Sequence, residues 1–152
     1  MVIMNNKLAL VFAFMLVAGL LILVSSAINI VIGIRINVNR PHPGEEIPLW
    51  AGIAIALAHI LSLFLKIVLI VLGTVSIAVG TLLIIASMKI NSGEPGRVRT
   101  WSIIGIVLSV IVLVVTSFFI AQGVFYIGFL LGFIGSILGL ISGLAGLMWK
   151  PI

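Results

Sequence analysis

The sequence predicts an all-α integral membrane protein, an antiparallel four-helix transmembrane bundle with a long second helix. Of its 152 residues, 63% are apolar and only 7% are charged. A soluble domain needs about a quarter of its residues charged to cover its surface. The charged residues also stand in short clusters between long apolar runs. Together these observations exclude a soluble globular enzyme and a disordered tail.

The first apolar run, 8–34, predicts one membrane-spanning helix, because a span needs about 20 apolar residues. Lys7 before this run and the small residues Ser25, Ser26 and Ala27 within it are typical of a signal peptide. The run continues well beyond these small residues, further than the apolar part of a signal peptide does. We therefore expect a retained first span.

The middle run, 49–88, is the hardest to divide. As one helix it would be about 60 Å long, about twice the hydrocarbon thickness of a membrane. Lys66 near its centre suggests two short spans, which gives a five-span alternative, but no Gly, Pro, Asn or Asp lies near enough to form a turn. We expect one continuous helix, whose start protrudes from the bilayer or lies in its interface. A row of seven-residue spacing crosses the centre and supports this choice: His59, Lys66, Gly73, Gly80 and Ser87.

The last run, 101–149, is too long for one span and predicts two helices. Its only polar interruption, Gln122-Gly123, stands near the middle and favours a turn. We therefore expect spans over about 101–121 and 124–149.

Two hydrophilic segments, Arg35–Pro48 and Lys89–Thr100, separate the runs and are expected to be loops, because they are rich in Pro, Gly and Asn. Glu45 and Glu46 precede the second helix, where carboxylates favour the positive end of the helix dipole. The whole chain, 1–152, is then a single helical bundle.

The cations predict orientation and partners, because Lys and Arg prefer the cytoplasmic side of a span. With four spans, most of them lie on the side of both termini. We expect a multi-pass protein of a prokaryotic cell membrane with both termini in the cytoplasm, although five spans with an external N-terminus satisfy the charges equally well. The net charge of +5 is spread over the borders of the runs, which predicts contact with anionic membrane lipids and no nucleic acid partner.

Small residues recur every seven positions in the predicted spans. Helices in lipid associate by close backbone approach, which small side chains permit, so these rows predict packing seams rather than a pore. The last span carries two rows, and we expect one to face its own bundle and the other to face a second protein or copy. The rows are Gly19, Ser26 and Gly33 in the first span; Ser102, Ser109, Thr116 and Gly123 in the third; and, in the last, Gly128, Gly135 and Ser142 as one row and Gly132, Gly139 and Gly146 as the other, with Gly143 beside them.

Lys66 is the one charge inside an apolar run, and His59 and Ser62 share its helix face. A lysine at mid-bilayer costs about 2.5–3.5 kcal/mol on insertion scales. Three interpretations stay open: Lys66 snorkels to lipid headgroups, it meets a carboxylate of a partner subunit, or it lines a water-filled path.

Few side chains offer chemistry. His59 is expected to be a packed residue, with a single haem ligand as the alternative. The sequence has no Cys and only three acidic residues, all in predicted loops, and it has no phosphate loop, zinc motif or catalytic triad. We therefore expect a protein that is not an enzyme and that holds no cofactor or metal.

These features predict a structural or accessory subunit that binds membrane lipids and other integral membrane subunits or copies of itself. By analogy, a respiratory or other energy-converting complex is such an assembly. The alternative is a small homo-oligomeric channel or transporter, with His59, Ser62 and Lys66 along its path.

Overall fold

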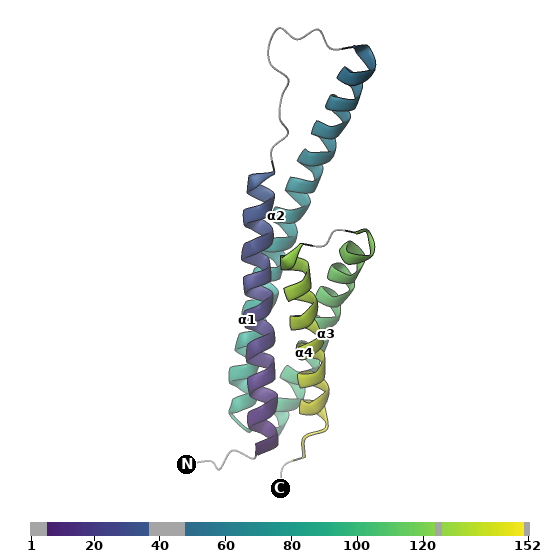
Figure 1. The fold of residues 1–152 in the computed structure, drawn as a ribbon. Helices are drawn as coiled ribbons and strands as arrows, with labels where there is room; N and C mark the ends of the chain where they lie inside the picture. The colour runs from purple at the N-terminus through teal and green to yellow at the C-terminus, as the bar shows by residue number, and fades with distance from the viewer. Residues whose placement is uncertain (1–5, 37–47, 124–125, 151–152) are drawn as a thin grey trace.

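The computed structural model describes residues 6–36, 48–123 and 126–150, and within these ranges it contains four α-helices and no strand (Figure 1). Each helix is long and apolar enough to cross a membrane. The prediction of an all-α chain with four long apolar helices, the second the longest, is therefore confirmed. The helices are α1 (Asn6–Arg35), α2 (Leu49–Asn91), α3 (Pro95–Ala121) and α4 (Ile127–Leu147).

The four helices alternate in direction, and both ends of the chain lie at the same end of the bundle (Figure 1). α1 packs extensively against α2 and α4, while α3 packs mainly on α4 and less extensively on α2. α2 runs without a break through Lys66 and continues well past the other three helices (Figure 1).

The connection between α2 and α3 is shorter than predicted. Lys89–Thr100 is mostly helical, and only Ser92–Glu94 separates the two helices. Pro95 occupies the first turn of α3, where its fixed φ and missing N–H fit. Gly93 ends α2 at a φ of +70°, which glycine adopts readily. The predicted end of the second helix at 88 and the predicted start of the third helix at 101 were both wrong. The polar residues between them mark the end of an apolar run rather than the end of a helix.

The turn predicted at Gln122-Gly123 is confirmed. Gly123 has a φ of +77°, and its N–H donates to the carbonyl of Ile120 at 3.0 Å. Residues 124 and 125 lie outside the described part, and α4 begins at Ile127 rather than at 124. The predicted position of Glu45 and Glu46 before α2 also lies outside the described residues.

Candidate functional site

The first row of small residues on α4 packs against α1. A Cβ atom added to Gly135 would lie 3.1 Å from the carbonyl oxygen of Ala18, and one added to Gly128 would overlap Asn29. The third member of the row, Ser142, donates a hydrogen bond of 2.6 Å to the carbonyl oxygen of Val11. This row therefore brings the two backbones into close contact.

The second row on α4 packs chiefly against α3. Gly139 and Gly146 contact Ser109 and Ser102, whose hydroxyls occupy the place that a Cβ would take. A Cβ on Gly132 would lie 3.1 Å from Thr116 of α3 and 2.8 Å from the Ser25 hydroxyl of α1. Gly143 beside them would meet the side chain of Ile106 at 2.5 Å. Such approaches of an oxygen to a glycine Cα are typical of tightly packed helices.

Both rows of α4 are therefore covered by helices of the same chain. The expectation that one row is left for a second protein needs correction, because α4 lies between α1 and α3: its first row packs on α1, and its second row packs on α3 and also meets α1. Gly123, which we placed in the α3 row, lies in the turn, and no side chain of the described helices lies within 4 Å of a Cβ added there.

α1 and α2 form a second seam from the other heptad rows. A Cβ on Gly80 would lie 3.0 Å from the carbonyl oxygen of Gly19, and one on Gly73 would lie 3.0 Å from that of Ser26. The side chains of Ile30 and Leu23 fill the remaining space over Gly73 and Gly80. α1 therefore covers the face of α2 on which the row continues from Lys66 toward Gly73 and Gly80.

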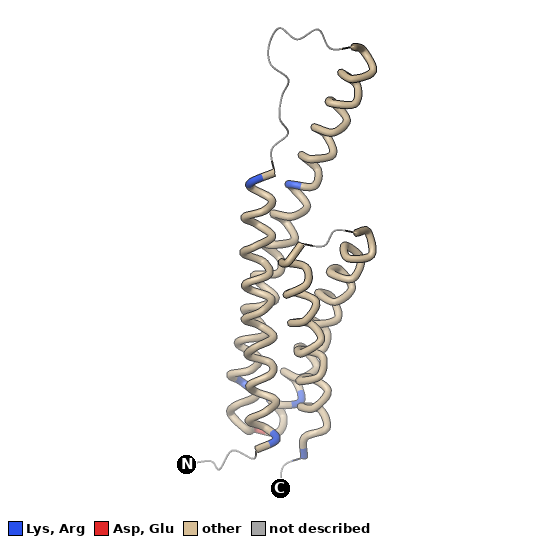
Figure 2. Tube along the Cα trace, in the orientation of Figure 1, with Lys and Arg blue, Asp and Glu red and all other residues tan. Residues whose placement is uncertain are grey.

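Lys66 lies where α1 ends. A Cβ added to Gly33 would lie 3.3 Å from the carbonyl oxygen of Lys66. Since Arg35 follows Gly33 by two residues, Lys66 lies within one helical turn of Arg35 along the bundle axis. The side chain of Lys66 is half-buried. Figure 2 shows the described cations in two groups, one at the end with the termini and one at the level where α1 ends.

His59 and Ser62 lie beyond the end of α1, in the part of α2 from Leu49 to Leu65 that we call the α2 extension. Both are half-buried, and the hydroxyl of Ser62 donates to the carbonyl of His59 at 2.8 Å within the helix. Among the described residues no three His, Asp or Glu side chains are placed to hold one metal ion.

The α2 extension exposes a broad apolar face. Leu57 is 68% exposed, and the exposed residues on this side recur every three or four positions, which places them on one side of a helix. At about 100° per residue, Lys66 and His59 lie about 180° and 200° from Leu57, on the opposite side. The apolar face of the extension consists of Trp50, Ile53, Leu57, Ile60, Leu61 and Phe64.

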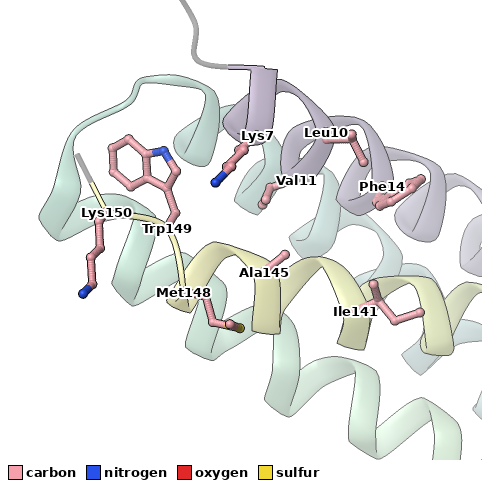
Figure 3. Close-up of a pocket in the computed structure, with 9 residues that line it drawn as sticks. All are labelled: Lys7, Leu10, Val11, Phe14, Ile141, Ala145, Met148, Trp149 and Lys150. Carbon is pink, nitrogen blue, oxygen red and sulfur yellow. The ribbon is translucent and has the colours of Figure 1, made fainter. Parts of the chain in front are cut away.

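A groove of about 550 Å³ lies between the start of α1 and the end of α4 (Figure 3). Its walls are mostly apolar, and lysines stand at the end nearer the termini. Sequence reasoning did not single out this groove, because its two walls come from opposite ends of the chain. The lining residues are Lys7, Leu10, Val11, Phe14, Ile141, Ala145, Met148, Trp149 and Lys150.

A small cavity of about 40 Å³ is lined by residues of all four helices. Ser25, Asn29, Ser76 and Thr116 contribute polar atoms to its wall, and the Oδ1 atom of the buried Asn29 has no hydrogen-bond partner in the described part of the chain. A cavity of this size can hold one water molecule. Asn29 was also missed at the sequence level, although it is the only Asn within the first apolar run.

No known family, curated protein or solved structure matches this chain. Its function therefore has to be inferred from the α2 extension, the bundle seams and the groove.

Proposed function

We propose that the chain is a non-catalytic multi-pass membrane protein that serves as a structural or accessory subunit of a larger membrane complex. In this proposal the four-helix bundle is the membrane anchor, and the α2 extension binds another integral membrane subunit. A respiratory or other energy-converting complex is the class of assembly to examine first. The observation that carries the proposal is the exposed apolar face of the extension, which none of the described helices covers.

The dimensions of the bundle support its place in the bilayer. α4 has 21 residues and is about 31 Å long, close to the hydrocarbon thickness of about 30 Å. Lys7 and Lys150 stand at one end of the bundle, and Lys66 and Arg35 stand near the other end of α1. Cations at both borders of an apolar slab are typical of membrane anchoring. The excess of cations at the end with the termini favours a cytoplasmic location for that end.

α2 is too long to be covered by the same bilayer. Its 43 residues extend for about 64 Å, and a tilt of 40°, the upper end of the usual range, still leaves about 49 Å. When the bundle occupies the hydrocarbon layer, the extension therefore projects beyond it. An apolar helix face in water is unfavourable, so another protein surface is the cover that we propose.

The shape of the exposed face suits a protein partner. Trp50, Leu57 and Phe64 are spaced by seven residues, and Ile53, Ile60 and Leu61 fill the positions between them. Large apolar anchors at this spacing dock a helix into a groove of a partner. α1 covers the face of α2 that continues from Lys66 to Gly73 and Gly80, so no water-filled path runs along that face in the bundle. The channel alternative therefore has less support than a structural subunit.

Site-specific photo-crosslinking in the native membrane tests this proposal. A photoreactive amino acid at Leu57 is compared with one at Val107, which is 52% exposed on α3 and serves as the lipid-facing control. We expect Leu57 to crosslink to a different integral membrane protein and Val107 to crosslink to lipid. Crosslinks from Leu57 to lipid alone would contradict the proposal. Crosslinks from Leu57 to a second copy of the chain would indicate a homo-oligomer instead.

A further inference from the structure

We propose that the groove between α1 and α4 binds one anionic phospholipid, with its phosphate at the lysine end and an acyl chain along the apolar walls. The inference rests on the proposed residence in a membrane, but it does not depend on the partner of the α2 extension. It also does not use the helix seams, since the groove opens on the outside of the bundle (Figure 3).

The walls of the groove suit an acyl chain. On α1, Leu10, Val11 and Phe14 lie on one helix face, and on α4, Ile141 and Ala145 lie one turn apart. The small Ala145 leaves the hollow between the larger side chains (Figure 3). From Lys7 to Phe14 the groove follows α1 for about 10 Å, long enough for the first part of an acyl chain. Its volume of about 550 Å³ lies in the range of small-molecule sites.

The charge of the groove suits an anionic headgroup. Lys7 and Lys150 come from opposite ends of the chain and both line the end of the groove nearer the termini, with Trp149 between them (Figure 3). Lys7 and Lys150 are the charged residues among the described lining. Lysine stems pack along apolar surface while their ammonium groups stay at the headgroup level.

Trp149 marks this end as a headgroup-level position. Its ring lines the groove beside the two lysines, and tryptophan favours the membrane–water interface because the ring is apolar and the N–H is polar. Two lysines and a tryptophan therefore stand at one end of an apolar groove, which is the arrangement that an anionic amphiphile complements.

Native mass spectrometry of the purified full-length protein tests the assignment. The protein in mild detergent is titrated with palmitoyl-oleoyl phosphatidylglycerol or with the zwitterionic phosphatidylcholine of the same chains. We expect tighter retention of one phosphatidylglycerol than of phosphatidylcholine. The double variant Lys7→Gln/Lys150→Gln should weaken phosphatidylglycerol binding about 25-fold, since one lysine near an anionic headgroup contributes about fivefold.

Two further variants distinguish lipid binding in the groove from a general effect of the protein's positive charge. Ala145→Leu fills the hollow from an exposed position, so it should abolish the tight site while the bundle stays folded. Lys89→Gln/Arg97→Gln removes two exposed cations that do not line the groove and should leave binding unchanged. Equal binding of both lipids by the wild type, or undiminished phosphatidylglycerol binding by Ala145→Leu, would overturn the inference. An equal loss in both double variants would also overturn it.

A competition experiment distinguishes a lipid headgroup from a free phosphate as the source of the bound anion. An excess of glycerol 3-phosphate, which carries the headgroup phosphate without acyl chains, should not displace the lipid. Displacement would show a phosphate site without a chain site and would overturn the inference. Failure of the crosslinking experiment at Leu57 would leave this result unaffected, because the lipid titration involves no partner protein.

Discussion

The hydroxyl of Ser142 on α4 donates a 2.6 Å hydrogen bond to the carbonyl oxygen of Val11 on α1, across 131 positions of sequence. Ser25 makes a bond in the opposite sense, from α1 to the carbonyl of Gly128 on α4, at 2.5 Å. The two bonds join the same helix pair near its two ends. They fix the distance between α1 and α4, and with it the width of the groove that Val11 lines.

Ser142→Ala is expected to destabilise the bundle by about 0.6 kcal/mol, and by no more than about 1.7 kcal/mol, the range for interhelical hydrogen bonds in membrane proteins. The cost is modest because an unfolded helix in lipid also finds other hydrogen-bond partners. Unfolding in mild detergent measures it. Ser136→Ala is the matched control, since the buried Ser136 hydroxyl bonds only within α4, to Phe133 at 2.7 Å. Equal effects of both variants would show that the link between helices contributes nothing.

Gly139→Leu is expected to destabilise the bundle by about 1–3 kcal/mol, the usual cost of overpacking a tight interior. The new side chain would overlap the hydroxyl of Ser109 on α3 and lie close to Ala18 on α1. Gly135→Leu should have a similar effect, because a Cβ there already lies 3.1 Å from the backbone oxygen of Ala18.

The control for these variants is Gly52→Leu, on the α2 extension, where no other part of the described chain lies within 4 Å of an added Cβ. Thermal unfolding in detergent should leave this variant at the wild-type midpoint or above it, because leucine favours helix more than glycine does. Unchanged melting of all three variants would mean that α4 does not pack inside the bundle.

The seven-residue rows predicted the seams because small residues on one helix face are needed wherever two backbones approach. They did not predict which helices meet. Gly139 contacts Ser109 of α3, and Gly135 contacts Ala18 of α1, because α4 lies between these two helices. That placement depends on the arrangement of all four helices, so it cannot be predicted from the residues of any single row.

Helix ends and the groove were harder to predict for different physical reasons. The first residues of α3 are polar, so hydropathy assigned them to a loop, whereas Pro95 after Gly93 was a local signal for a helix start. Lys7 and Lys150 lie at the same end of the bundle because an even number of helices brings both termini to one end. The four-span prediction therefore implied that both lysines lie at one end. It did not imply that α1 packs against α4, which forms the groove between them.

Single cysteines test the placement in the membrane, and the chain has no native Cys to interfere. Ser92→Cys lies in the exposed turn between α2 and α3, while Gly52→Cys lies on the α2 extension at the other end of the bundle. A membrane-impermeant maleimide added to intact cells should label Gly52→Cys only. After permeabilisation it should label both. Labelling of both, or of neither, in intact cells would put the two positions on one side and support the five-span arrangement.

Lys66→Met should leave the partner bound. Lys66 lies at the level of Gly33 near the end of α1, and it lies on the side of α2 opposite the apolar face of the extension. In the proposed membrane placement its ammonium would reach lipid headgroups rather than a subunit docked on Leu57. Affinity purification in mild detergent should recover the same proteins with Lys66→Met as with the wild type, whereas Leu57→Glu, which introduces a charge into the proposed contact, should lose the partner. If Lys66→Met released the partner from a normally folded bundle, Lys66 would pair with a carboxylate of that subunit, because removing one member of a buried ion pair leaves the other charge without compensation.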